Sequence, residues 1–355
     1  MINTETLTEP TAMKRIIHAL AAAVLLTAGC AQKSDVEKVV VAYVTSWTEV
    51  MPDPGRVTHV NYAFGHVTDS FDGVRVDNED RLRSIVALKA QEPALNVLVS
   101  VGGWGSGRFS EMASDEASRI SFARDCARLV KEFGLDGIDI DWEYPTSSAA
   151  GISSSPADTE NFTLLMRDLR EALGQDKLLT LASVCSARYI DFPAIMQYVD
   201  FVNIMSYDMG WAPKHNAPLY RADADGNVSP IVGEHTADEA VKAHLAAGVP
   251  ACKLVMGMPL YGRGNSETYG AGLDYNELTG PLPGHTEIWD EIARVPYYAA
   301  QDGTLHLGFE NVRSITEKCS YLLDQGLLGG MYWEYSGDNE EGDLTLTISR
   351  LVLGR

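Results

Sequence analysis

DGIDIDWEYP, residues 136–145, alternates carboxylates with large apolar side chains over the length of one short β-strand. Alternate residues of a strand point to the same side. One side therefore carries three acids and the other three apolar residues: Asp139, Asp141 and Glu143 against Ile138, Ile140 and Trp142. In a closed parallel barrel the apolar side would pack on the surrounding helices, and the acids would line the interior.

The rest of the chain repeats one unit, a short β-branched run followed by a longer helical segment. Eight runs are predicted as strands: 39–44, 57–64, 96–101, 137–142, 178–184, 199–206, 253–259 and 328–332. Helical patterns lie between them at 78–91, 115–133, 157–173, 236–247 and 311–325. Eight near-continuous apolar strands without a break in composition predict an α/β fold, a (β/α)8 TIM barrel, as a single domain over 39–355.

A doubly wound open sheet is the structural alternative to the barrel. That fold is expected to carry a glycine-rich phosphate-binding loop directly after its first strand. The corresponding residues here, Tyr43-Val-Thr-Ser-Trp47, do not resemble such a loop. The pattern therefore favours the closed barrel.

Residues 1–30 have the pattern of a bacterial secretory signal. A basic pair at 14–15 is followed by an apolar run at 16–26 and then by Thr-Ala-Gly-Cys, which ends at Cys30. The run is shorter than the ~20 residues that span a bilayer. Small residues before a cysteine resemble a lipobox, in which Cys30 becomes the acylated N-terminus. We therefore expect a signal and lipoprotein segment, and the alternative is a buried N-terminal helix.

A short polar tether at 31–38 would join this anchor to the barrel. The protein would then be secreted across the inner membrane and attached by lipid to a bacterial envelope membrane, on its periplasmic or cell-surface side. Met13 is an alternative start to Met1, because the first twelve residues have no signal character.

The formal net charge of −21 limits the classes of partner. Nucleic acids and anionic membrane surfaces bind basic patches, so neither is expected, and only the lipid anchor would reach a membrane. A neutral polysaccharide is compatible with an acidic protein. The cysteines after Cys30 are scattered, without CxxC or other metal-ligand spacing. We expect no metal, no cofactor and a monomer.

The three acids of the strand at 136–145 are costly to bury and are therefore candidates for catalysis. Carboxylates a few Å apart cannot all ionise, so their pKa values are driven apart. Glu143 is the last of the three and would lie at the carboxyl-terminal mouth, where barrel active sites form. A raised pKa would make it a general acid near neutral pH. The alternatives are a solvated acidic strand end or a Mg²⁺ or Ca²⁺ site with further ligands from elsewhere.

The same strand resembles the DxxDxDxE signature of glycoside hydrolase family 18, the chitinases and endo-β-N-acetylglucosaminidases, through Asp136, Asp139, Asp141 and Glu143. Other segments are similar to elements of this family, in the same order. These are SVGGW at 100–104, MSYD at 205–208, HNAPLY at 215–220, GMPLYGR at 257–263 and GGMYWE at 329–334. The resemblance runs from 39 to 333 and implies a barrel enzyme that hydrolyses chitin or chito-oligosaccharides. HNAPLY favours the bacterial chitinase branch.

The resemblance implies a retaining mechanism in which the substrate assists. Glu143 would protonate the glycosidic oxygen, and the 2-acetamido oxygen of the substrate would attack C1 to give an oxazolinium ion. Asp141 would orient the acetamido group, and Asp139 would share a proton with Asp141. Tyr207 and Asp208 would hydrogen-bond the acetamido group and the sugar at the cleavage point. Water activated by the deprotonated Glu143 would complete hydrolysis.

The resemblance also implies a row of substrate-binding residues at the strand ends. Trp333 matches the aromatic floor beneath the sugar, since apolar sugar faces stack on flat rings. The other positions expected to bind substrate are Tyr43, Phe64, Gly103, Trp104, Tyr144, Met205, Asp208, Trp211, Tyr261 and Arg263. Packing is the alternative role for the aromatic residues, and a solvated or structurally paired side chain is the alternative for Arg263.

Two departures from the family pattern bear on the substrate. Many processive chitinases insert an α+β subdomain between strand seven and the next helix, whereas about 46 residues, 264–309, are available here. We expect a rudimentary or absent subdomain and an open groove. Without an accessory chitin-binding module after the last helix, we expect soluble oligosaccharides as substrates. The alternatives are an endo-β-N-acetylglucosaminidase acting on N-glycan cores and a glycan-binding lectin without activity.

Overall fold

The computed structural model describes residues 37–265, 269, 272–278, 280 and 282–355. The predictions for the segment at 1–30, including the lipidation of Cys30, and for most of the tether fall outside these residues. Contacts delimit one compact unit over Lys38–Arg355. Within the described ranges, no helix is long and apolar enough to cross a membrane.

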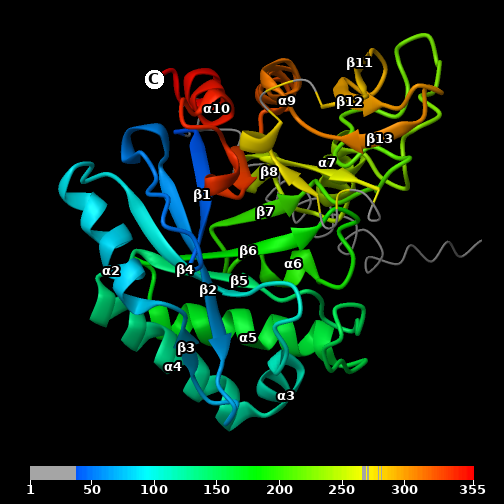
Figure 1. Ribbon diagram of the computed structural model, residues 1–355. Helices are drawn as coiled ribbons and strands as arrows, with labels where there is room; N and C mark the ends of the chain where they lie inside the picture. The colour runs from blue at the N-terminus through cyan, green and yellow to red at the C-terminus, as the bar shows by residue number, and fades with distance from the viewer. Residues whose placement is uncertain (1–36, 266–268, 270–271, 279, 281) are drawn as a thin grey trace, which may run out of the picture. The chain divides into compact units, whose positions relative to one another are not determined.

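Eight parallel strands close into a barrel, as the sequence predicts (Figure 1). They are β1 (Val39–Thr45), β2 (His59–Val67), β4 (Asn96–Gly102), β5 (Gly137–Asp141), β6 (Leu178–Val184), β7 (Phe201–Met205), β8 (Leu254–Pro259) and β14 (Gly329–Trp333). β14 pairs with both β8 and β1, and β1 pairs with β2, which closes the sheet. β3 (Val74–Val76) extends β2 as an antiparallel hairpin. The (β/α)8 barrel is thus confirmed.

Helices follow the strands and cover the outside of the barrel (Figure 1). They are α2 (Glu79–Ala87), α3 (Phe109–Ser114), α4 (Glu116–Phe133), α5 (Asp158–Leu173), α6 (Phe192–Ile195), α7 (Ala237–Ala246), α9 (Val312–Asp324) and α10 (Asp343–Leu353). α4 begins at Asp115, whose side chain accepts a hydrogen bond from the backbone N–H of Ser118. It ends at Gly134, whose φ of 72° suits a residue without a side chain. Local capping therefore sets the length of this helix.

β5 has its apolar and acidic side chains on the predicted sides. Trp142 stacks on Phe109 of α3, with ring centroids 5.3 Å apart. Asp139 faces the interior and lies in register with Ser100 of β4 and Thr180 of β6. The interior at this level is polar and fully buried, with the side chains Asn61, Ser100, Asp139, Thr180 and Asn203.

The segment between β8 and α9 forms a small antiparallel sheet with strand order β10-β9-β13-β12-β11. The strands are β9 (Tyr261–Gly264), β10 (Leu273–Asp274), β11 (Thr286–Asp290), β12 (Val295–Ala299) and β13 (Leu305–Gly308). The sheet has its own core, in which the rings of Tyr298 and Phe309 stack 4.8 Å apart beside Leu278 and Leu307. The insertion is therefore present in a reduced form, which is one of the two outcomes that the sequence predicts. Its strands have only two to five residues, too few to show a clear alternation in the sequence.

Candidate active site

The carboxyl ends of the barrel strands surround a cavity of about 570 Å³. β5 ends at Asp141, and Glu143 follows two residues later, so both acids reach the cavity. β7 ends at Met205 and leads into Tyr207 and Asp208. The cavity is lined by Tyr43, Trp47, Phe64, Trp104, Asp141, Glu143, Tyr144, Ala182, Val184, Cys185, Met205, Tyr207, Asp208, Trp211, Arg263 and Trp333. The lining thus combines the carboxyl groups of Asp141, Glu143 and Asp208 with several aromatic rings.

Asp139 lies beneath the cavity and is held by four hydrogen bonds. Its Oδ2 accepts from the hydroxyls of Tyr43 at 2.9 Å and Ser100 at 2.8 Å. Its Oδ1 accepts from the hydroxyl of Thr180 at 2.5 Å and the amide of Asn203 at 3.3 Å. Complete burial raises its pKa, and the four donors oppose that rise. Both oxygens thus face hydrogen-bond donors, which come from β1, β4, β6 and β7, an environment unlike that of a metal ligand.

Asp141 lines the cavity, and one of its carboxyl oxygens is buried. Among the described residues, its Oδ1 has no hydrogen-bond donor. Burial, then the charge of Glu143 and then that of Asp139, raise its pKa well above the usual value. No direct hydrogen bond joins Asp139 and Asp141 in the described part of the chain, and the proton shared between them stays a prediction. A buried oxygen of this kind is a ready acceptor for an N–H group of a ligand.

Glu143 is half-buried in the cavity wall and is partly protonated at neutral pH. Burial raises the pKa of its carboxyl to about 7, a hydrogen bond with Tyr144 opposes this rise, and the charge of Asp208 adds to it. Asp141 and Tyr207 also lie within electrostatic range of Glu143. An acid with this pKa can give a proton to a leaving oxygen near neutral pH.

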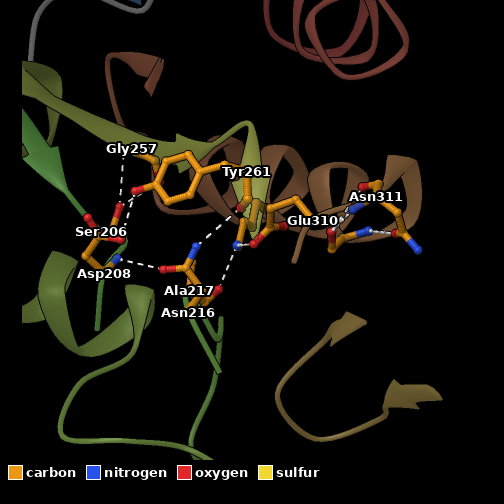
Figure 2. Close-up of polar contacts among 10 residues, drawn as sticks. Ser206, Asp208, Asn216, Ala217, Gly257, Tyr261, Glu310 and Asn311 are labelled. Carbon is orange, nitrogen blue, oxygen red and sulfur yellow. Dashed lines mark hydrogen bonds and ion pairs between the residues drawn. The ribbon is translucent and has the colours of Figure 1, made fainter. Parts of the chain in front are cut away.

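Asp208 is held against β9 by an ion pair with Arg263 and by the hydroxyl of Tyr261. Figure 2 shows Asp208 beside Tyr261. Arg263 donates from Nε to Oδ1 at 2.7 Å and from Nη2 to Oδ2 at 2.9 Å. The hydroxyl of Tyr261 donates to Oδ1 at 2.9 Å. The guanidinium of Arg263 also lies over the ring of Trp211, 4.7 Å from its centroid. Tyr207, the preceding residue, is buried at the cavity wall.

Trp333 is the centre of the first of two aromatic groups in the cavity. Its ring stacks on Phe64 at a centroid distance of 5.5 Å and lies 5.7 Å from Tyr43. Trp47 lies 6.4 Å from Trp333 and is 63% exposed, so it extends the group toward solvent. Phe64 is nearly parallel to Trp333, at 22°, whereas Tyr43 and Trp47 are tilted to it by 57° and 56°, so the rings form a curved apolar cluster beside the acids.

Trp104 and Tyr144 form the second aromatic group, with ring centroids 6.4 Å apart. Tyr144 in turn stacks on Tyr189 at 5.5 Å. Gly103 does not line the cavity. A side chain at this position would meet the ring of Phe64 at 2.7 Å, so the glycine leaves room for that ring.

The family to which the chain belongs follows from its similarity to known proteins. Residues 39–338 match the family described as glycosyl hydrolases family 18. The chain belongs to this family. It is therefore a glycoside hydrolase, and several of the proteins to which it is similar are named chitinases.

Chitinase A1 of Niallia circulans is 34% identical to this family 18 chain, over 84% of this chain and 47% of the relative, so the chain spans about half the length of that protein. Chitotriosidase-1 of Mus musculus is 31% identical, over 92% of this chain and 79% of the relative. The structure of a family 18 N-acetylglucosaminidase from Paenibacillus barengoltzii has a TM-score of 0.78 at 34% identity, and the match covers 89% of this chain and 100% of that one. A Group IV chitinase of Ostrinia furnacalis in complex with allosamidin has a TM-score of 0.78 at 27% identity, covering 90% and 99%.

Most residues expected from the family 18 resemblance lie in or directly beside one cavity. Asp139, Gly103 and Tyr261 lie outside its lining and support residues within it. The residues of the site that the sequence does not predict are Thr180, Asn203, Asn216, Cys185 and Tyr189. The sequence does contain an indication of Thr180 and Asn203, since each is a polar residue within an apolar strand and could therefore be expected to face a polar interior. Tyr189 lies in a loop after β6 that has no distinctive pattern.

Proposed function

We propose that this family 18 hydrolase is a chitinase that cleaves β-1,4 linkages between N-acetylglucosamine units. The observation that carries the proposal is the pairing of Glu143, with a pKa of about 7, and Asp141, whose buried Oδ1 has no donor among the described residues. An N-acetylglucosamine unit stacked on Trp333 would present a leaving oxygen to the first acid and an amide N–H to the second. The chitinase names of the relatives support the same substrate class.

The reaction begins with transfer of a proton from Glu143 to the glycosidic oxygen. As the bond from C1 to that oxygen breaks, the carbonyl oxygen of the 2-acetamido group bonds to C1 and an oxazolinium ion forms. Asp141 accepts the amide N–H through its buried Oδ1 and so holds the acetamido group in place for the attack on C1. Water then gives a proton to the Glu143 carboxylate and attacks C1. This step releases the acetamido group and leaves the new reducing end as the β-anomer.

The site does not favour a covalent glycosyl-enzyme intermediate. Retaining enzymes of that kind place a free carboxylate nucleophile roughly 5–5.5 Å from the acid. Both oxygens of Asp208 are bonded by Arg263, and Tyr261 adds a further donor. Asp141 is buried, and its pKa is raised. The nucleophile is therefore supplied by the substrate, which restricts the reaction to N-acetylated sugars.

An endo-β-N-acetylglucosaminidase acting on N-glycan cores is the second candidate, because the same chemistry needs only one N-acetylated sugar at Trp333. A longer linear substrate is favoured by the aromatic rings at the mouth, since Trp47 and Trp104 are 63% and 64% exposed. A lectin would bind glycans through these rings but would have no use for a general acid with a raised pKa.

The proposal is tested by incubating the protein with chitotetraose and chitopentaose and identifying the products by mass spectrometry and early ¹H NMR spectra. We expect shorter chito-oligosaccharides whose new reducing ends are β-anomers. Initial α-anomers would contradict the substrate-assisted mechanism. Release of glycans from a glycoprotein without cleavage of the oligomers would identify the endoglycosidase, and binding without cleavage would identify the lectin.

The pH dependence of kcat/KM is expected to show a fall on the alkaline side with an apparent pKa close to 7. Only the protonated form of Glu143 can start the reaction, and burial raises its pKa to about 7. The rate should therefore fall tenfold per pH unit well above that value. Initial rates on chitotetraose from pH 5 to 9 provide the measurement. A fall that begins near pH 4.5, the ordinary value for glutamic acid, would show that burial does not set the proton affinity of this acid.

A further inference from the structure

Asp208 has a backbone conformation that requires support from its surroundings. Its φ of 54° lies in the left-handed region, which disfavours residues with a side chain. Even so, its carboxylate is bonded to Tyr261 and Arg263 of β9. Its charge also contributes to the raised pKa of Glu143. The placement of this one carboxylate therefore bears on the catalytic acid.

Asn216 provides the support (Figure 2). Its side-chain oxygen accepts a hydrogen bond from the backbone N–H of Asp208 at 2.9 Å. Its side-chain nitrogen donates to the carbonyl of Tyr261 at 3.3 Å. Its own carbonyl accepts from the backbone N–H of Met209 at 2.9 Å. One buried amide thus ties the turn after β7 to β9, the strand that carries both partners of the Asp208 carboxylate.

The segment that carries Asn216 is itself fixed from both sides. The ammonium group of Lys318 in α9 donates to the carbonyl of Ala217 at 2.7 Å. Nε2 of His215 lies 3.0 Å from Oδ2 of Asp290 in β11, and the His215 side chain is 1% exposed. Because His215 and Ala217 are both anchored, Asn216 is held in place independently of the turn after β7. Its side chain therefore anchors the backbone of that turn by a hydrogen bond.

We propose that Asn216 is a positioning residue of the active site. It holds the backbone of Asp208 in the conformation that places the carboxylate in the lining of the cavity that also contains Glu143. In that place the carboxylate keeps its bonds to Tyr261 and Arg263. Asn216 is not among the residues that line the cavity, so it acts through Asp208 and does not touch the substrate. The inference rests on the proposed function, because Asp208 matters to the reaction only if Glu143 is the acid.

The test is a double-mutant cycle on the cleavage of chitotetraose. Asn216→Leu removes both amide hydrogen bonds with little change in size. We expect kcat to fall about 10- to 100-fold and KM to change less than about threefold, because the carboxylate of Asp208 is misplaced while the aromatic rings that stack on the sugar remain. In an Asp208→Asn background the same substitution should lower kcat by less than about threefold, since no carboxylate is left to position.

Asn96→Leu is the matched control, because this asparagine lies at the amino end of β4, away from the cavity, and should leave kcat unchanged. If Asn216→Leu fails to fold, Asn216→Ala removes the same two bonds without added volume. Equal losses of kcat in both backgrounds, or a loss confined to KM, would overturn the inference.

A crystal structure of the Asn216→Leu protein decides the inference independently of turnover. We expect Asp208 to leave its left-handed conformation and to lose its contacts with Arg263 and Tyr261. An unchanged Asp208 would overturn the inference even if the wild type cleaves the oligomer. A wild type that does not cleave any N-acetylglucosamine polymer would instead overturn the proposed function, while the structural comparison still stands.

Discussion

Replacing Glu143 with glutamine is expected to lower kcat on chitotetraose by about 10²–10⁴-fold, with nearly unchanged affinity for the oligomer. Glutamine matches the size of the side chain but cannot transfer a proton to the leaving oxygen. The aromatic rings around Trp333 and the buried oxygen of Asp141 remain available to bind sugar. Steady-state rates and calorimetric binding of chitotetraose provide the two measurements.

Glu171→Gln is the matched control for this substitution, since it makes the same chemical change at an exposed site on α5. It should leave both kcat and binding unchanged. A Glu143→Gln protein that keeps more than about a tenth of the wild-type kcat would exclude Glu143 as the general acid. Loss of binding together with activity would instead point to a misfolded site.

The Glu143→Gln substitution should also make the folded protein more stable at alkaline pH. The pKa of Glu143 is raised in the folded state from its ordinary value of 4.5 to about 7, so the folded state binds the proton more tightly than the unfolded chain. The free energy of unfolding therefore falls as the pH rises between these two values, and the loss is complete above pH 7. Allowing for partial exposure of the side chain, we expect a loss on the order of 1–3 kcal/mol.

Urea unfolding of the wild type and the Glu143→Gln protein at pH 4 and pH 8 measures this effect. The two proteins should have similar free energies of unfolding at pH 4. At pH 8 the variant should be the more stable, because it carries no charge to bury. The same difference at both pH values would mean that ionisation of Glu143 has no cost in the folded state.

The parts of the fold that the sequence predicts are those fixed by local periodicity. The two-residue period of β5 is sufficient to place Asp139 inside the barrel and Trp142 against the helices. The position of Glu143 follows from the same register, since it is the next inward residue after the end of the strand. The insertion lacks this regularity, because β10 has two residues and β9 and β13 have four each. Its five-stranded sheet depends on contacts between distant segments, which a single sequence does not reveal.

The supporting residues of the site escaped prediction for the same reason. Thr180 and Asn203 bond Asp139 across 41 and 64 residues of sequence. Asn216 lies in a segment whose sequence resembles the family, but its role depends on the backbone of Asp208 and on the carbonyl of Tyr261, 45 residues away. Residue type indicates which side chains can do chemistry, whereas the partners that orient them are determined by the packing of the barrel strands against one another.

Lys318→Met is expected to lower the free energy of unfolding by about 3–5 kcal/mol. The side chains of Lys318 and Glu310 are 0% and 1% exposed and form an ion pair. Burial lowers the pKa of the lysine and raises that of the glutamic acid, and each partner's charge opposes the shift of the other. Removing the lysine alone leaves a buried carboxyl group without a compensating charge. Urea unfolding at pH 7 provides the measurement.

Lys242→Met is the matched control, because Lys242 is 67% exposed and pairs with Asp238 on the surface of α7. Its loss should cost less than about 1 kcal/mol. A similarly small loss for Lys318→Met would show that the buried pair is not an important source of stability.

The double variant Lys318→Met, Glu310→Leu separates the stability of the buried pair from its effect on the active site. Removal of both charges together should restore most of the stability, because no buried charge is left uncompensated. The carbonyl of Ala217 nevertheless loses its donor, and this carbonyl belongs to the residue next to Asn216. We therefore expect a stable protein with a kcat several-fold below that of the wild type. A double variant that recovers both stability and full activity would show that the placement of Asp208 does not depend on the anchoring of this segment to α9.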